Sequence, residues 1–344
     1  MHCHSKLFFC LAAVCTAWAG PIDFGKQEFA SALAERKLPS NRFRVQTEVS
    51  TEAPESFRIV GARISGGDIR GIMYGLLEAA QQIRSTGRLV QAKGAAAMRV
   101  RGLRVPITAG DLEKDWFHSR AYWEELLGTL ARSRLNRLNL AFEERAVLGG
   151  RVLDTLRLIS EIASAYAVDL VLSVRPEAVT SAGLDLRSLL ASCPAIRSVQ
   201  VTGVAPGRLD LVRAVSEAGR RVTVEIPHQD LTPGVLDEVA GTGAPWLVSA
   251  LYKGQSPPAV AGAEALIWRL EAPSAAGRAE WSDPAFVRKT LLELAQPGVA
   301  GFEIEAPQAV SLDANRLLYL LWGRLSYDPK APETLWGGKA TKKK

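Results

Sequence analysis

The chain has 344 residues, of which 47% are hydrophobic and 23% are charged. This balance is typical of a globular protein with a packed core, and it excludes a disordered chain and a protein made mainly of membrane spans. The formal net charge is +6, but Lys339, Lys342, Lys343 and Lys344 form a basic tail within residues 331–344. Because the rest of the chain is nearly neutral and has no basic stripe, we expect no nucleic-acid partner.

The first nineteen residues have the pattern of a secretory signal peptide. Lys6 precedes an apolar run from Leu7 to Trp18, and the small residues Ala17 and Ala19 stand before Gly20. The alternative is a buried N-terminal helix, but the small residues favour cleavage after residue 19. We therefore expect a secreted or periplasmic protein with no membrane segment after cleavage. Nothing in the sequence indicates its oligomeric state.

Removal of residues 1–19 would leave Cys193 as the one cysteine, with His118 and His228 as the histidines. A structural zinc site needs about four such ligands, and a disulfide needs two cysteines. We therefore expect no metal, no cofactor and no intrachain disulfide. Cys193 precedes an apolar segment and is interpreted as a buried structural thiol.

Residues 20–92 predict a small α+β accessory domain. Helical spacing extends over Gln27–Lys37, and alternation typical of strands covers Phe43–Thr47 and Phe57–Val60. Asp68 is placed to cap a helix over Ile69–Ile83. The next segment, 91–97, is rich in small residues and is predicted to be a linker.

Residues 98–330 repeat a short apolar strand, a turn and an amphipathic helix. Eight strand candidates end near Pro106, Phe142, Val174, Thr202, Ile226, Leu251, Leu270 and Ile304. Helices are expected at Tyr122–Arg134, Val152–Ala165, Arg208–Ala218, Pro284–Ala295 and Asn315–Leu325. Eight such units in about 230 residues predict a (β/α)₈ TIM barrel, so the fold class is α/β with a small α+β domain in front.

Alternation along the strands predicts which side chains face the barrel lumen. Active sites of such barrels lie at the C-terminal ends of the strands, so these side chains are the candidates for chemistry. Leu138, Leu140 and Phe142 are expected to face the helices instead. The predicted inner set is rich in glutamate and arginine: Arg104, Asn139, Ala141, Glu143, Ser173, Arg175, Gln200, Thr202, Thr223, Glu225, Arg269, Glu271, Gly301, Glu303 and Glu305.

Four glutamates of this set are the candidate catalytic residues: Glu225, Glu271, Glu303 and Glu305. Glycoside hydrolysis generally needs two carboxyl groups beside the scissile bond, one protonated and one ionised. The alternative is that inward arginines pair with these glutamates in a buried structural network. The sequence leaves both interpretations open.

Candidate substrate-binding residues lie on the same face of the predicted barrel. They are Arg104, Asn139, Glu143, Arg175, Lys253, Arg269 and Trp281. Inward arginines suit the carboxylate of a uronic acid, because a guanidinium binds a carboxylate through two hydrogen bonds. Trp281 is interpreted either as a platform on which a sugar ring stacks or as part of the core.

The accessory segment resembles the domain that precedes the catalytic barrel in α-glucuronidases and β-hexosaminidases. The resemblance lies in Phe57–Val60, Ile64–Gly75 and Gln81–Ile83. Barrel segments are similar to bacterial α-glucuronidase-like proteins, namely Met98–Gly102, Tyr122–Leu140, Trp281–Pro284, Gly301–Ile304, Leu321–Leu325 and Tyr327–Pro329. The resemblance implies a TIM barrel that acts on a carbohydrate substrate.

One departure from that family concerns its general acid, a glutamate implied at the end of the fourth strand. This chain has Thr202–Gly207 there, with no carboxylate. Either Glu225 on the fifth strand supplies the acid, or the protein is a catalytically inactive relative that binds carbohydrate or a protein partner. A third alternative, an aldolase or isomerase, is disfavoured because no lysine is clearly inward on a strand.

Overall fold

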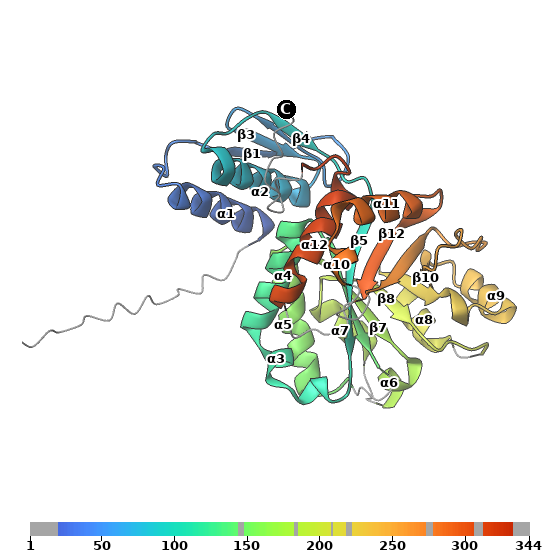
Figure 1. Cartoon of the computed structure of the whole chain (residues 1–344). Helices are drawn as coiled ribbons and strands as arrows, with labels where there is room; N and C mark the ends of the chain where they lie inside the picture. Colours follow the sequence, from blue (N-terminus) through green and yellow to red (C-terminus); the bar gives the residue numbers. More distant parts are fainter. Residues whose placement is uncertain are drawn as a thin grey trace, which may run out of the picture.

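The computed structural model describes residues 20–143, 148–181, 185–207, 209–217, 222–272, 278–305 and 312–332. The predicted signal peptide and most of the basic tail lie outside these ranges. The chain folds into a small α/β unit and a closed barrel of eight parallel strands (Figure 1), which confirms the predicted fold class. Within the described ranges, every helix is too short or too polar to cross a bilayer.

The accessory unit is a mixed four-stranded sheet covered on one face by two helices (Figure 1). Its elements are α1 (Pro21–Glu35), β1 (Gln46–Val49), β2 (Phe57–Val60), β3 (Arg63–Gly66), α2 (Ile69–Thr86) and β4 (Ala92–Gly94), in the sheet order β1-β3-β2-β4. Asp68 caps α2 as predicted, since its carboxylate accepts a hydrogen bond from the Gly71 nitrogen at 2.6 Å. The segment predicted as a linker instead supplies strand β4, because its backbone pairs with β2.

The glycines before and within α2 are required by close backbone contacts. A Cβ atom at Gly67 would lie 1.9 Å from the Ala53 carbonyl oxygen, and one at Gly71 would lie 2.1 Å from the Ser56 carbonyl oxygen. No side chain fits these distances. Gly67 and Gly71 therefore allow the start of α2 to pack against the loop that contains Ala53 and Ser56.

All eight predicted barrel strands are present. They are β5 (Val100–Ile107), β6 (Arg137–Phe142), β7 (Asp169–Val174), β8 (Ile196–Val201), β9 (Thr223–Pro227), β10 (Trp246–Leu251), β11 (Leu266–Glu271) and β12 (Val299–Glu305). Each pairs in parallel with its sequence neighbour, and β12 pairs with β5 to close the barrel.

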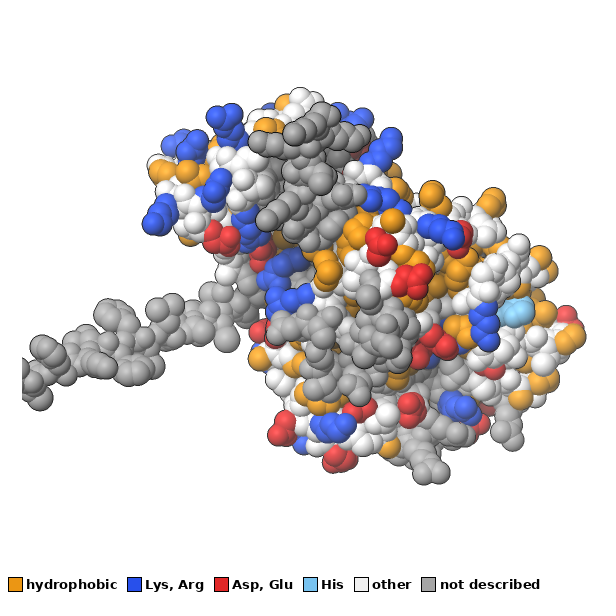
Figure 2. Space-filling model, viewed as in Figure 1, with side chains coloured by type: hydrophobic (Ala, Val, Ile, Leu, Met, Phe, Trp, Pro, Cys, Tyr) orange, Lys and Arg blue, Asp and Glu red, His pale blue; other side chains and the backbone are white. Residues whose placement is uncertain are grey.

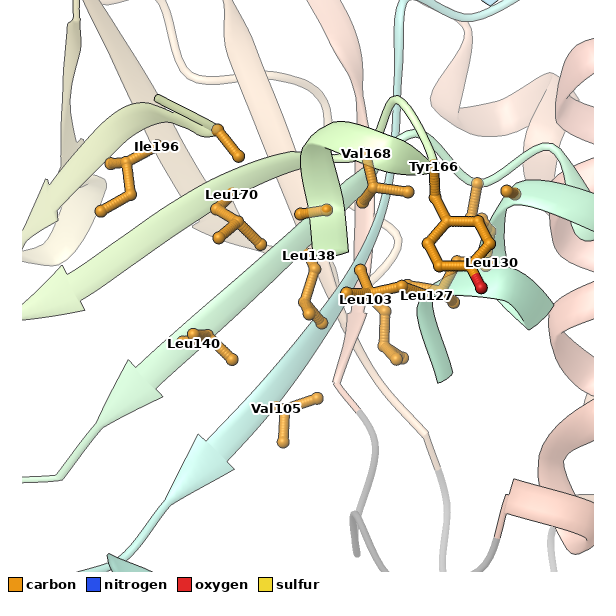
Figure 3. Close-up of a cluster of buried hydrophobic side chains, with 14 of the residues drawn as sticks. Leu103, Val105, Leu127, Leu130, Leu138, Leu140, Tyr166, Val168, Leu170 and Ile196 are labelled. Carbon is orange, nitrogen blue, oxygen red and sulfur yellow. The ribbon is translucent and has the colours of Figure 1, made fainter. Parts of the chain in front are cut away.

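Helices and short turns connect the strands around the outside. The described ones are η1 (Asp111–Glu113), α3 (Asp115–His118), α4 (Arg120–Ser133), α5 (Arg151–Ala165), α6 (Pro176–Ser181), α7 (Leu186–Ser192), α8 (Asp210–Ser216), η2 (His228–Asp230), α9 (Pro233–Gly241), α10 (Arg278–Trp281), α11 (Pro284–Leu294) and α12 (Leu312–Tyr327). The apolar core lies between strands and helices, where Leu103, Leu138 and Leu170 meet Leu127 and Leu130 of α4 (Figure 3). This is the outward face that alternation predicts.

The accessory unit is joined to the barrel by a buried ion-pair network. Glu55 accepts hydrogen bonds from Arg70 at 2.7 Å, from Arg101 at 2.5 Å and from the Asn136 side chain at 2.8 Å. Burial by itself would raise the pKa of Glu55, but Arg101 and Arg70 outweigh it and the pKa is lowered. Arg101 is at the start of β5, so the accessory unit covers the end of the barrel where the strands begin.

A second buried arginine completes this junction. The Arg134 guanidinium lies 5.1 Å from the centroid of the Phe57 ring and 4.7 Å from those of Tyr74 and Tyr327. Three aromatic faces around one cation give an attraction that is strongest where water is excluded. The opposite end of the barrel, where the strands end, carries no contact with the accessory unit among the elements described.

Candidate functional site at the barrel mouth

The predicted inner side chains meet inside the barrel in two layers below its mouth, the end at which the strands terminate. The deep cluster consists of Arg137 and Asn139 from β6, Glu225 from β9 and Glu303 from β12. Arg137 donates to both carboxylates, to Glu303 at 2.5 Å and to Glu225 through its Nη2. Asn139 adds a hydrogen bond of 2.8 Å to the other oxygen of Glu303.

Both glutamates of the deep cluster have an exposed fraction of 0%. Burial raises the pKa of Glu225, and Arg137 opposes that rise. Burial is the largest single effect on Arg137 and by itself would lower its pKa. The two carboxylates together outweigh burial, so the pKa of Arg137 is raised. Glu225 and Glu303 are thus shielded from solvent and paired with the same arginine, an arrangement of the kind expected under the structural-network interpretation of these glutamates.

The second layer lies nearer the mouth and is organised around Gln200 of β8. Its Oε1 accepts from Arg104 Nη1 at 2.6 Å and from the Ser173 hydroxyl at 2.7 Å. Its Nε2 donates to Glu225 at 2.5 Å and to the Ser249 hydroxyl at 2.9 Å. Gln200 thus connects strands on opposite sides of the lumen and has an exposed fraction of 0%.

The mouth itself carries the two remaining glutamates. Glu305 accepts from Arg104 Nε at 3.1 Å, and its side chain is 30% exposed. Glu271 is exposed and is the register partner of Glu305 on the neighbouring strand. Adjacent strands lie about 4.8 Å apart, so these two carboxylates share one edge of the mouth.

Two arginines stand beside this pair. Burial lowers the pKa of Arg104, Glu303 opposes this effect, and the nearby positive charge of Arg269 adds to the lowering. The Nε of Arg269 is buried without a hydrogen-bond partner in the described structure. A buried donor without a partner is costly, by about 1–3 kcal/mol. Two guanidinium groups thus lie close together beside the glutamates of the mouth.

The other predicted binding residues are more dispersed. Arg175 follows β7, and its guanidinium lies near Gly203 at the end of the fourth strand. Glu143 and Lys253 are exposed beyond the ends of β6 and β10. The ring of Trp281 packs 5.0 Å from that of Trp322, which favours the core role of its two alternatives.

The fourth strand, β8, ends at Val201, directly before Thr202–Gly207 as predicted, and this segment has no carboxylate. The Asp230 carboxylate, in η2 after β9, accepts a hydrogen bond there from the Gly203 nitrogen at 2.7 Å. In the described part of the chain, no three His, Cys, Asp or Glu residues gather as a metal site would require. Cys193 is fully buried.

The prediction from the sequence missed Arg137, the residue that forms ion pairs with two of the candidate glutamates. Arg137 lies two positions before Asn139, so extending the strand alternation by one step would have placed it on the inner face. Gln200 and Ser173 were placed inward, but their role as connectors depends on distances across the barrel. On the face shown in Figure 2, Lys and Arg predominate on the accessory unit, and acidic and basic side chains are interspersed on the barrel.

The sequence matches no family model and no curated protein sequence. Its fold is similar to solved glycoside hydrolases. A GH138 enzyme described as targeting pectin rhamnogalacturonan II matches with a TM-score of 0.69 and 14% identity, over 92% of this chain and 50% of that one. A chitobiase from Flavobacterium johnsoniae, FjGH20, matches with a TM-score of 0.56 and 11% identity, over 88% of this chain and 64% of that one.

A third structure, CpGH84B, matches with a TM-score of 0.53 and 14% identity, over 91% of this chain and 67% of that one. The chain thus spans about half the length of the GH138 enzyme. At these identities the similarity shows a glycoside hydrolase-like fold, a TIM barrel preceded by a small mixed-sheet domain. This similarity does not support the narrower assignment to α-glucuronidase-like proteins.

Proposed function

We propose that this chain is an exported glycoside hydrolase-like protein that acts on glycans containing uronic acids at the barrel mouth. The observation that carries the proposal is the pairing of Glu271 and Glu305 at the ends of adjacent strands, beside Arg104 and Arg269. Of the four candidate catalytic glutamates, these are the two that solvent reaches. The glycoside hydrolase-like fold and the α-glucuronidase resemblance of the sequence support the reaction class.

In this proposal the two glutamates at the mouth share the chemistry. Glu305 accepts a hydrogen bond from Arg104, and we assign it the role of nucleophile or stabiliser of positive charge at the anomeric carbon. Glu271 is exposed to solvent beside it, and we assign it proton transfer to the leaving oxygen. A separation of about 5–5.5 Å between two such carboxyl groups leads to retention of configuration.

The substrate class follows from the arginines. The side chain of Arg269 is partly exposed, and a uronic acid carries a carboxylate that its guanidinium can bind. An anion at this point also relieves the repulsion between Arg269 and Arg104. Neutral sugars offer only hydroxyl groups, which satisfy a guanidinium less well than a carboxylate does.

A second function is favoured by a specific observation. The fourth strand ends without a carboxylate, and Arg137 seals Glu225 and Glu303 in the deep cluster. A barrel with this arrangement would bind uronic acid glycans without cleaving them. The residues that contact the glycan are the same in both functions.

The test is an assay of the purified protein on aryl glucuronides, aryl galacturonides and neutral aryl glycosides. Wild type should cleave a uronide, and Glu271→Gln and Glu305→Gln should each lower kcat by roughly 10²- to 10⁴-fold. Lys289→Gln, an exposed substitution on α11, serves as the control and should leave kcat unchanged. Inactivity of wild type on every substrate, together with micromolar to millimolar binding of an oligouronate, would replace hydrolysis by the binding function.

A further inference from the structure

Gln200 connects the sealed deep cluster to the mouth. On one side, its Nε2 donates to Glu225, which Arg137 holds in place. On the other side, its Oε1 accepts from Arg104 Nη1, and Arg104 Nε donates to Glu305. The sequence of contacts is therefore Glu225, Gln200, Arg104 and Glu305, and it runs from the fully buried layer to the solvent.

The contacts of Gln200 fix the direction in which its amide points. Arg104 is a donor at every nitrogen, so it requires the amide oxygen on its side. Glu225 accepts through its oxygen and requires the amide nitrogen on the other. A reversed amide would place two donors against each other at Arg104 and two acceptors against each other at Glu225. Gln200 is thus held in one orientation by partners on both sides.

Arg104 is fixed in turn at two edges of its guanidinium. Nη1 is bound to Gln200 at 2.6 Å, and Nε is bound to Glu305 at 3.1 Å. Nη2 has only a long contact of 3.5 Å with the Ser173 hydroxyl. Because a guanidinium is planar, the bonds to Gln200 and Glu305 together restrict the plane in which it lies, and without Gln200 the guanidinium can turn about its contact with Glu305.

We propose that Gln200 is a positioning residue that orients the Arg104–Glu305 pair for its ligand, although Gln200 itself lies below the surface and touches no substrate. This inference rests on the proposed function only in assigning the pair a ligand. Gln200 orients Arg104 whether or not a ligand is bound. Preorganised polar groups bind a ligand more tightly because they lose less freedom on binding.

The first experiment needs no ligand. In protein labelled with ¹⁵N-arginine, a guanidinium held at both edges rotates slowly about its Nε–Cζ bond and gives separate Nη signals. Arg104, assigned by comparison with Arg104→Lys, should show this signature in wild type and lose it in Gln200→Leu. Ser249→Ala removes another partner of the Gln200 amide but leaves the contact with Arg104, so its Arg104 signals should be unchanged. Unchanged Arg104 signals in Gln200→Leu would overturn the proposal.

The second experiment is a double-mutant cycle with trigalacturonate as the ligand. Gln200→Leu should weaken binding by roughly 10- to 100-fold, since a small displacement of a binding group has effects of this size. Added to Arg104→Met, the same substitution should cause no further loss, because its effect passes through Arg104. Equal losses with and without Arg104 would instead indicate a general structural role and overturn the proposal.

Gln200→Asn covers the case in which Gln200→Leu does not fold. The shorter amide keeps polar atoms in the lumen but cannot reach both Arg104 and Glu225. It should lose the slow-rotation signature while the unfolding transition stays cooperative. If wild type binds no trigalacturonate, the proposed function fails, and the ¹⁵N signature still decides whether Gln200 orients Arg104.

Discussion

Replacing Arg137 by methionine would remove the one cation of the deep cluster. Glu225 and Glu303 would then remain at 0% exposure, with Gln200 as the hydrogen-bond partner of Glu225 and Asn139 as that of Glu303. Removing one partner of a buried ion pair typically costs about 3–5 kcal/mol, because a buried charge is left without compensation. We expect the free energy of unfolding of Arg137→Met to fall by about this amount at pH 7.

The control is Arg157→Met, which makes the same chemical change on the surface. Arg157 pairs with Asp154 at 2.7 Å, and their side chains are 48% and 75% exposed. An exposed pair of this kind contributes about 0–1 kcal/mol. Urea denaturation followed by circular dichroism measures both variants, and an unchanged slope of the transition shows that the native and unfolded states stay comparable.

The pH dependence of Arg137→Met follows from the same contacts. Burial raises the pKa of Glu225 in the folded protein, and Arg137 opposes that rise. Without Arg137 the pKa rises further, so folded Glu225 takes up a proton at a higher pH than in wild type and the unfolded state does not change. The stability deficit of Arg137→Met should therefore shrink as the pH falls from 7 toward 4.5. A deficit equal to that of Arg157→Met, or one independent of pH, would refute the structural role assigned to the deep cluster.

Three further predictions concern the accessory unit and the N-terminus. Leu76→Ala should lower the free energy of unfolding by about 2–5 kcal/mol, because Leu76 is 0% exposed on α2; a neutral denaturation curve would contradict its place in the core. Glu55→Gln should cost about 3–5 kcal/mol at pH 7, since it leaves Arg70 and Arg101 buried without their carboxylate. Because the pKa of Glu55 is lowered, ionised Glu55 stabilises wild type above about pH 4.5, and this stabilisation is lost on acidification. Plots of unfolding free energy against pH for wild type and Glu55→Gln should therefore converge in acid, and parallel plots would contradict this network. Mass spectrometry of the exported protein should find Gly20 as the first residue, and a chain beginning at Met1 would exclude cleavage.

The barrel was predictable because parallel strands and amphipathic helices differ in period. Leu138 and Leu140 alternate with Asn139, and that alternation assigned the faces of β6 correctly. Strand β4 was missed because Ala92–Gly94 has no apolar alternation and forms a strand only through pairing with β2. Its structure depends on the partner strand, which local sequence does not encode.

The candidate site was predictable in part. Alternation identifies the inward glutamates but not their depth, so Glu225 and Glu305 look alike in the sequence. In the structure Glu225 is fully buried and pairs with Arg137 from another strand, whereas the Glu305 side chain is 30% exposed near the mouth. Trp281 illustrates the same limit, since its contact with Trp322 joins segments that are forty-one residues apart. Contacts across the fold decide which polar residues are structural and which are available to a ligand.

A crystal structure of the Glu271→Gln, Glu305→Gln double variant soaked with trigalacturonate tests directly whether the barrel mouth binds a uronate. Both substitutions keep the shape of the mouth and remove its two candidate reacting groups, so an intact ligand can accumulate. We predict a uronate carboxylate within hydrogen-bond distance of Arg269, with the sugar next to residues 271 and 305. A ligand bound elsewhere, with the mouth empty, would contradict this prediction.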